Sequence, residues 1–261
     1  MSRVETVLIT GASSGIGLEL AKCFAADGSK LVLVARNQDA LEKLAEELRQ
    51  KYKIETVVLP ADLTLSESPR QIFNKLSAQN ISVDVLVNNA GFGLHGEFVG
   101  LPLDRQMEII EVNVTALTEL TGLFLPGMIQ RRSGGILNVG SVAGFIPGPR
   151  LAVYYASKAF VQSFSEALAE ELDGTGVSVT SLCPGPTESN FGAIARGNKE
   201  RVSQASKMPT EVVARYGHYA FRNKKVVAVP GFRNRLLIFL IRLLPRSTVR
   251  RMVKGYNKFK D

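Results

Sequence analysis

Thr10-Gly11-Ala12-Ser13-Ser14-Gly15-Ile16-Gly17 lies between an apolar run, residues 4–9, and a helical pattern that begins at Leu18. A strand, a glycine loop and a helix in this order form an anion site, because loop N–H groups and the positive end of the helix point at one spot. Glycine lets the backbone approach a phosphate closely and adopt positive φ. A glycine triplet alone is a weak signal, but its place at the first turn of a βαβ pattern favours a phosphate site over a flexible turn.

Seven short apolar runs alternate with helical patterns along the chain. Most of these runs are apolar throughout, which is typical of strands buried on both faces of a parallel sheet. We therefore predict an α/β fold, a single Rossmann-type doubly wound parallel sheet with helices on both faces. Pro126 is expected to kink or restart a helix over residues 104–130. The expected strands are residues 4–9, 31–34, 56–59, 83–87, 135–139, 177–182 and 226–229.

We expect one domain over residues 1–261, because no linker, repeat or low-complexity segment interrupts the alternation. Within it, residues 187–222 are expected to cover the substrate, and residues 232–261 form basic C-terminal helices. We expect no signal peptide, because the first predicted strand begins within a few residues of Met1, and no membrane span, because no apolar run is judged long enough to cross a bilayer.

The cysteines and histidines indicate a cytoplasmic protein without a metal site. Cys23 and Cys183 lie far apart in apolar surroundings and are expected to be reduced. His95 and His218 lack the spacing of metal ligands, so solvated or loop positions are expected for both.

An arginine, Arg36, follows the second predicted strand, at the position where dinucleotide-binding folds usually carry an acid for the ribose hydroxyls. No carboxylate occurs there before Asp39. A guanidinium favours a 2′-phosphate through its charge and planar donors, which predicts NADP in preference to NAD. A solvated loop role for Arg36 is the alternative. Asp62 is a candidate acceptor for the adenine amino group, with a turn or capping role as its competitor.

Tyr154 and Lys158 are four residues apart in a helical pattern and therefore share a face. An ammonium beside a phenol favours the phenolate, so we expect a lowered pKa and a general acid/base role for Tyr154. Ser141 ends the preceding strand and can donate a hydrogen bond to a carbonyl oxygen. Asn113, in the middle of a helix, needs polar partners, which suggests a water or the region of Lys158.

Together these motifs resemble the short-chain dehydrogenase/reductase family over about the first 190 residues. The resemblance implies a catalytic tetrad of Asn113, Ser141, Tyr154 and Lys158, with Lys158 also on the nicotinamide ribose. It further implies that Asn89, Ala90 and Gly91 support the cofactor and that residues 184–187 flank the nicotinamide. The complete set of expected dinucleotide contacts is Gly11, Ser13, Ser14, Gly15, Ile16, Gly17, Arg36, Asn37, Asp62, Leu63, Asn89, Ala90, Gly91, Tyr154, Lys158, Pro184, Gly185 and Thr187.

The resemblance implies an NADP(H)-dependent oxidoreductase that transfers hydride between the nicotinamide and a carbonyl or alcohol substrate. A non-catalytic dinucleotide-binding sensor or assembly protein is the alternative, which the intact tetrad disfavours. The resemblance also implies a homodimer or homotetramer through residues 104–130 and 152–172. Several apolar residues near the active edge predict an apolar substrate pocket, with plain core packing as an equal alternative. They are Phe92, Leu94, Phe145, Ile146, Pro147, Phe191, Ile194, Met208 and Pro209.

The net charge of +8 arises at the C-terminal end, where residues 222–261 hold 12 Lys and Arg and only one acid, Asp261. Residues 236–244 are apolar nearly all round and, as a helix, are too short to cross a bilayer. Two alternatives remain for this segment: burial against its own domain or a partner subunit, or contact with an anionic membrane surface. Nucleic-acid binding is disfavoured because the basic segment has few aromatic residues.

Overall fold

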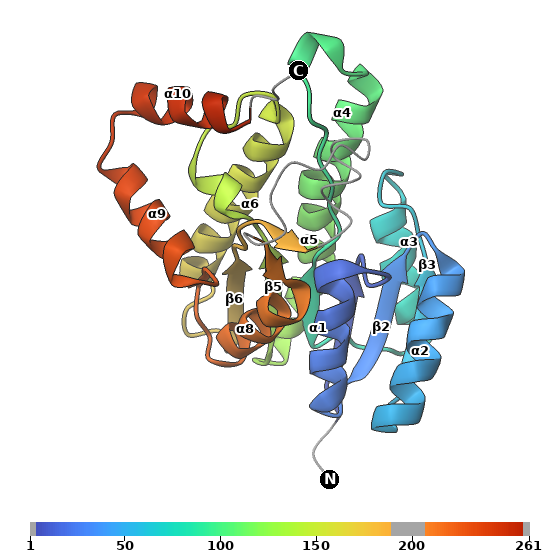
Figure 1. The fold of residues 1–261 in the computed structure, drawn as a ribbon. Helices are drawn as coiled ribbons and strands as arrows, with labels where there is room; N and C mark the ends of the chain where they lie inside the picture. Colours follow the sequence, from blue (N-terminus) through green and yellow to red (C-terminus); the bar gives the residue numbers. More distant parts are fainter. Residues whose placement is uncertain (1–3, 189–206, 258–261) are drawn as a thin grey trace.

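The computed structural model describes residues 4–188 and 207–257. Its centre is a parallel sheet with the strand order β3-β2-β1-β4-β5-β6-β9 (Figure 1). A separate pair, β7 (Thr187–Glu188) and β8 (Met208–Pro209), lies beyond β6. The strands of the main sheet are β1 (Thr6–Thr10), β2 (Lys30–Ala35), β3 (Thr56–Pro60), β4 (Val85–Asn88), β5 (Gly134–Val139), β6 (Val177–Leu182) and β9 (Val227–Ala228).

Helices cover both faces of this sheet, as the apolar runs predict (Figure 1). Successive strand residues point to opposite faces, so Val7 and Ile9 pack under α1, α2 and α8, whereas Leu8 packs under α3, α5 and α6. The helices are α1 (Gly15–Ala26), α2 (Gln38–Tyr52), α3 (Ser68–Ala78), α4 (Leu103–Ile110), α5 (Leu117–Gln130), α6 (Ala152–Glu171), α8 (Thr210–Arg222), α9 (Phe232–Arg242) and α10 (Arg246–Tyr256).

The topology locates the ligand edge. Strand β1 pairs with β2 on one side and with β4 on the other. Strands β2 and β3 are added on one side of β1 and the later strands on the other side, so the strand order reverses between β1 and β4. In open parallel sheets, ligands bind beyond the carboxyl ends of the strands at such a reversal. The glycine loop after β1 and the Asn88–Gly91 turn after β4 both lie there.

The long helical segment after β4 differs from the expectation in two ways. A π-helical turn, Glu111–Ala116, joins α4 to α5, and α5 continues through Pro126 without a break. The continuous segment Leu103–Gln130 is also long and apolar enough to cross a membrane by length and composition, contrary to the expectation that no segment is. Its residues Leu120, Phe124 and Met128 are buried under the sheet, which identifies α5 as a core helix.

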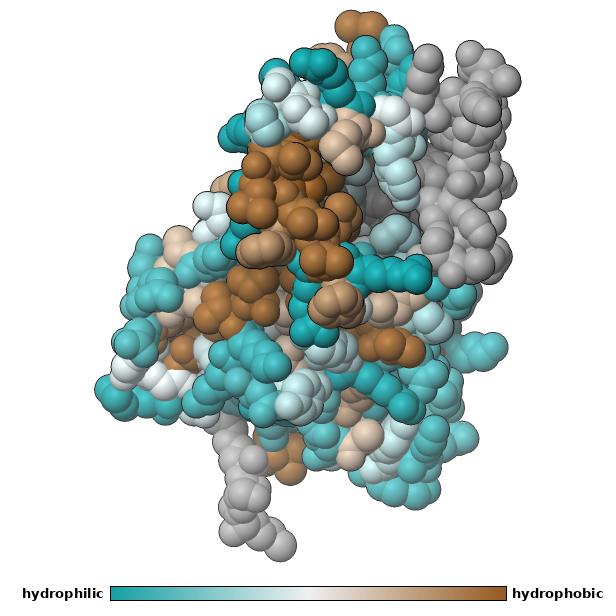
Figure 2. Space-filling view, turned by 60° about the vertical axis from the view of Figure 1, so that its left-hand side comes forward, coloured by the Kyte–Doolittle hydropathy of each residue, from teal (hydrophilic) through white to brown (hydrophobic). Residues whose placement is uncertain are grey.

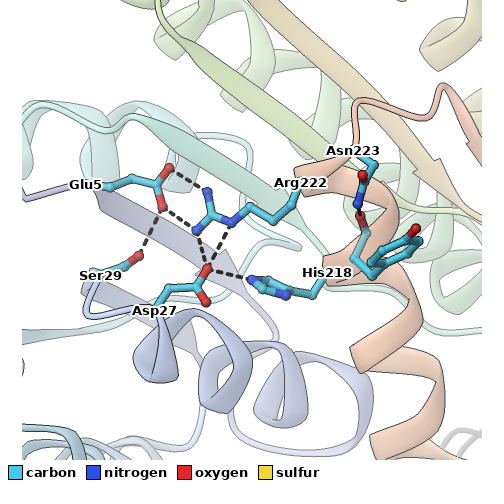
Figure 3. Close-up of polar contacts among 7 residues, drawn as sticks. Glu5, Asp27, Ser29, His218, Arg222 and Asn223 are labelled. Atoms are coloured by element: carbon cyan, nitrogen blue, oxygen red, sulfur yellow. Dashed lines mark hydrogen bonds and ion pairs between the residues drawn. The ribbon is translucent and has the colours of Figure 1, made fainter.

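Ion pairs anchor α8 to the amino-terminal end of the sheet (Figure 3). Arg222 donates to both carboxylate oxygens of Glu5 (2.8 and 2.7 Å) and to Asp27, which also accepts from His218 (2.8 Å). The guanidinium lies over the Phe24 ring, 5.0 Å from its centre. His218 is therefore a structural residue far from the ligand edge.

Candidate active site

The glycine loop adopts the backbone geometry that its sequence predicts. Gly11 and Gly15 have φ values of +66° and +58°, a region that side chains other than glycine rarely adopt. A Cβ on Gly17 would lie 2.4 Å from the Gly11 carbonyl oxygen. Ser14 caps α1 through its backbone position, without a side-chain hydrogen bond to the first turn. The N–H groups of that turn therefore remain available to an anion.

Thr10 and Asn89 brace this loop against the turn after β4. The Asn89 amide donates to the carbonyl oxygens of Thr10 (2.8 Å) and Gly11 (3.1 Å). The Thr10 hydroxyl accepts from the N–H groups of Asn89 and Ala90 at 3.0 Å each. Asn89 thus holds the loop in shape, and Thr10 is a supporting residue that the sequence analysis missed.

A cleft of about 1200 Å³ opens along this edge. Every residue expected at the dinucleotide lies on its wall except Gly17, which packs behind Gly11. Arg36 marks one end of the cleft and is exposed there. Tyr154 and Lys158 lie on the wall beyond the glycine loop. The size of the cleft and its uncapped helix end fit a dinucleotide with space for a substrate.

Two of the expected adenosine contacts have structural roles as well. The Asn37 side chain caps α2 by accepting from the Ala40 N–H (3.0 Å). Asp62 Oδ1 accepts from the N–H and the hydroxyl of Thr64 (3.0 and 2.9 Å). The turn role that competes with adenine binding at Asp62 is therefore present, on one of its two carboxylate oxygens.

Three of the tetrad residues meet at the cleft. A hydrogen bond links Tyr154 with Ser141, which itself accepts from the Ala143 N–H. Lys158 is buried and donates to the Val139 carbonyl oxygen (2.7 Å), and its Nζ lies 5.9 Å from the centre of the Tyr154 ring.

The expected lowering of the Tyr154 pKa is wrong. Burial raises the pKa of Tyr154 to about 12, because a phenolate is costly away from water, although the Ser141 hydrogen bond opposes the change. Burial also lowers the pKa of Lys158 to about 8 by disfavouring its ammonium form. Desolvation is therefore the largest influence on both pKa values, and at Tyr154 the opposing interaction comes from Ser141 and not from Lys158.

Asn113 sits behind the cleft wall, in the π-helical turn. Its amide donates to the Phe92 carbonyl oxygen (3.0 Å) and to the Ser157 hydroxyl (2.9 Å), and its Oδ1 accepts from the Phe92 N–H (3.1 Å). Ser157 is next to Lys158 on α6, so the expectation that Asn113 has a polar partner in the region of Lys158 is confirmed. The Asn113 side chain thereby joins the loop after β4 to α6.

The substrate end of the cleft contains residues that the sequence analysis missed. Helices α9 and α10 contribute to its wall, together with Arg105 from α4. Among the expected apolar residues, Phe92, Ile146 and Met208 line the cleft, whereas Phe191 and Ile194 lie outside the described residues. The contributions of the C-terminal helices are Arg233, Asn234, Leu237, Ile241, Val249, Met252, Val253, Tyr256 and Asn257.

Comparisons with known proteins agree with this geometry. A family model described as short chain dehydrogenase matches residues 5–200. The chain belongs to the short chain dehydrogenase family. A short-chain dehydrogenase of Sphingobium yanoikuyae, solved in complex with NADPH, is similar to it with a TM-score of 0.82 and 34% identity, covering 88% of this chain and 89% of that one.

Two further relatives differ in what they are named for. The bulky-bulky ketone specific alcohol dehydrogenase of Comamonas testosteroni has a TM-score of 0.79 and 31% identity, with 93% of each chain covered. A very-long-chain 3-oxoacyl-CoA reductase of Bos taurus is 38% identical over 69% of this chain. This short chain dehydrogenase spans 58% of the length of that bovine relative.

Family membership decides between the two function classes. This short chain dehydrogenase is an oxidoreductase that binds a nicotinamide dinucleotide and acts on a small-molecule substrate. A non-catalytic sensor on the same fold is not favoured.

Proposed function

We propose that this chain is an NADP(H)-dependent reductase of ketones or aldehydes with an apolar body, or the corresponding alcohol dehydrogenase in reverse. The observation that carries the proposal is the position of Ser141, Tyr154 and Lys158 on the wall of a cleft that also contains the glycine loop and Arg36.

Some residues of the cleft would bind the substrate and the cofactor, and one, Tyr154, would transfer a proton. When bound in this cleft, a nicotinamide would supply the hydride that reduces the carbonyl carbon. Ser141 and Tyr154 hydrogen-bond the carbonyl oxygen, and the Tyr154 hydroxyl gives its proton to the oxygen as negative charge develops there. Lys158 would hold the ribose of the cofactor, and its ammonium form places a positive charge near Tyr154. Asn113 is a positioning residue, because it fixes the loop at Phe92 against the catalytic helix.

Arg36 supports NADP as the dinucleotide. Its exposed guanidinium at the end of the cleft can pair with a 2′-phosphate through two parallel hydrogen bonds. In the described part of the chain, Arg36 makes no ion pair that would compete with a phosphate.

The names of two relatives support an apolar substrate. One is named for bulky ketones and the other for very-long-chain 3-oxoacyl-CoA, and both substrates combine a ketone with an extended apolar group. In this chain, Leu237, Ile241 and Val249 line the substrate end of the cleft. These side chains favour an aliphatic or aromatic group beside the reacting carbonyl.

We also propose that residues 1–261 act as one unit and assemble as a homodimer or homotetramer through α4–α5 and α6. Exposed apolar residues on these helices support the interface, among them Met107, Ile110 and Phe160.

A substrate screen tests the proposed function. Purified protein is mixed with NADPH and a panel of ketones and aldehydes, including apolar 3-oxoacyl esters, and the NADPH absorbance is followed. We expect turnover of at least one ketone with a bulky apolar group, and a loss of about 10²–10⁴-fold in kcat for Tyr154→Phe.

Tyr155→Phe is the matched control, because its ring lies next to Tyr154 without belonging to the tetrad. Binding of NADPH, measured by its fluorescence, is expected to be similar in both variants. Full activity of Tyr154→Phe on a substrate that the wild type reduces would show that the proton donor is assigned wrongly.

A further inference from the structure

Helix α9 carries its apolar stripe on the outside of the molecule. At 100° per residue, Phe232, Leu236, Phe239 and Leu240 of α9, with Leu243 at the C-cap, fall within about 100° of the helix circumference. These five side chains are 43–72% exposed. The side of the molecule that carries α9 shows a continuous apolar patch bordered by hydrophilic residues (Figure 2). Amphipathic helices of globular proteins normally turn such a stripe toward the core.

The inner face of α9 is occupied already. Ile238 is buried against Cys183 and Val229, and Leu237 and Ile241 line the cleft. The orientation of the helix is therefore set by its own contacts, and the outer stripe is not a core face that could turn inward. Monomeric proteins rarely expose a contiguous apolar patch without a partner for it.

Exposed cations occur on α9 beside the stripe and on α10, the next helix in the chain. Arg235 and Arg242 lie beside the stripe on α9, and the exposed side of α10 adds Arg246, Arg250, Arg251 and Lys254. The sequence from Arg222 to Lys260 contains no Asp or Glu. Within residues 4–188 and 207–257, none of these six cations forms an ion pair. Their charge is therefore not neutralised by the neighbouring surface.

We propose that α9 and α10 form a docking surface for a bilayer that contains anionic lipids. The α9 stripe would enter the boundary between headgroups and acyl chains, and the six cations would contact the headgroup phosphates. With 11 residues, α9 is about 16 Å long and lies in the plane of the interface, because it is too short to cross the bilayer.

The positive charge of α9 and α10 favours an anionic bilayer over a second copy of the chain as the partner of this surface. Two copies that met through this surface would bring their twelve cations together without acids between them, which opposes association. An anionic bilayer attracts the same charges. Because the inner face of α9 lines the cleft, docking would also place the substrate end of the cleft beside the bilayer; this consequence alone rests on the proposed function.

Vesicle flotation of the full-length protein tests the proposal without cofactor or substrate. The vesicles are phosphatidylcholine alone or phosphatidylcholine with phosphatidylglycerol. We expect flotation with the anionic vesicles only, and its loss in 1 M NaCl, where the screening length falls to about 3 Å. Arg242→Gln with Arg246→Gln and Arg250→Gln should weaken binding by about 100-fold, from roughly fivefold per cation.

Two matched variants separate this surface from charge and apolarity in general. Lys43→Gln with Lys51→Gln and Lys75→Gln removes three exposed cations elsewhere and should float nearly as the wild type does. The double variant Phe239→Ser, Leu243→Ser has the same net charge as the wild type. It should float weakly, because it has lost two apolar side chains of the stripe. Circular dichroism and NADPH fluorescence verify that each variant is folded.

A fluorescent reporter detects insertion directly, because the chain contains no tryptophan. The emission of Phe239→Trp should shift to shorter wavelength with anionic vesicles and be quenched by lipids brominated on the acyl chains. Phe98→Trp, at a position of similar exposure, should show neither effect. Unchanged emission of Phe239→Trp, or wild-type protein that stays with the soluble fraction, would overturn the proposal. So would a Phe239→Ser, Leu243→Ser variant that binds vesicles normally but loses self-association in sedimentation.

Discussion

Burial and hydrogen bonding act in opposite directions on the Tyr154 phenol. Burial favours the neutral form and raises the pKa, and the Ser141 hydrogen bond lowers it, with a pKa of about 12 as the result. A phenol ordinarily titrates near pH ~10. In the protein without cofactor, Tyr154 should therefore remain protonated through the range in which exposed tyrosines ionise.

Difference spectroscopy at the tyrosinate absorption band measures this titration. The spectrum of Tyr154→Phe is subtracted from that of the wild type at each pH. We expect no tyrosinate signal from Tyr154 up to about pH 10, because the raised pKa keeps its proton in place. A tyrosinate band in the difference spectrum near pH 8 would mean that the charge of Lys158 outweighs burial, as the spacing of the two residues suggested.

The position of Arg36 leads to a prediction about the affinity for NADPH relative to NADH. Arg36→Ala should weaken NADPH binding by about 10–100-fold, because a hydrogen bond to a charged group contributes roughly 1.5–3 kcal/mol. NADH binding should change little, since it lacks the 2′-phosphate. Titration of protein fluorescence or of NADPH fluorescence gives both dissociation constants. Lys43→Ala, which removes one exposed cation from the same region, is the control, and equal losses for NADPH and NADH in Arg36→Ala would contradict the assignment.

At the scale of single residues, the sequence predicts conformation and position well where the backbone dictates them. The positive φ of Gly11 and Gly15 follows from glycine itself, and the positions of Arg36 and Ser141 follow from the ends of strands. The prediction fails where the role depends on what surrounds a side chain. The pKa of Tyr154 is governed by burial. The π-helical turn that contains Asn113 follows no periodicity by which the sequence could predict it.

At the scale of elements, α8 is attached to the sheet through one arginine and an apolar face. Arg222 bridges Glu5 and Asp27, and all three side chains are about one-third exposed. Solvent screening reduces the strength of such pairs. Val213, Ala214 and Phe221 remain buried against α1 and the sheet, so α8 should stay in place when the ion pairs are removed.

Arg222→Met should therefore lower the free energy of unfolding by about 1 kcal/mol, with a fall in Tm of roughly 2–4 °C. The loss should shrink in 1 M NaCl, which screens the wild-type pairs as well. Thermal denaturation followed by circular dichroism measures it. Arg215→Met is the matched control: it removes a more exposed pair with Glu211 on the same helix and should have a smaller effect. Equal shifts for the two variants would show that the bridge contributes nothing beyond a surface pair.

The elements themselves were largely predictable. Short apolar runs locate all seven strands of the main sheet, and most of these runs are apolar throughout because a central parallel strand is buried on both faces. The orientation of α9 was not predictable, since residues 236–244 are apolar nearly all round and any face of that helix could be buried. Ile238 is the residue of α9 that is buried, because it packs against Cys183 and Val229. Only the tertiary fold brings Cys183 and Val229 to this position.

At the scale of the whole molecule, the cleft is built from two distant parts of the chain. The dinucleotide end comes from the βαβ repeat, whereas the substrate end is completed by α9 and α10. The C-terminal end of α10 is tied back by two hydrogen bonds at Asn257. Its carbonyl oxygen accepts from His95 (3.0 Å), and its side-chain amide donates to the Pro149 carbonyl oxygen (2.9 Å).

The double variant His95→Ala, Asn257→Ala should loosen α10 without disturbing the dinucleotide end. We expect faster amide hydrogen exchange in Arg246–Tyr256, because local opening then breaks fewer contacts. Exchange in β1 and the glycine loop, and the dissociation constant for NADPH, should remain unchanged. For a substrate with a bulky apolar group, KM should rise more than kcat falls, since the wall lost is on the binding side.

Asn223→Ala is the control for removing an asparagine hydrogen bond, because its amide donates to Tyr219 at the end of α8, away from the cleft. That variant should leave α10 exchange as it is in the wild type. If the double variant also weakened NADPH binding, the two ends of the cleft would be coupled through α10. The division between a cofactor end set by the sheet and a substrate end set by the C-terminal helices would then have to be abandoned.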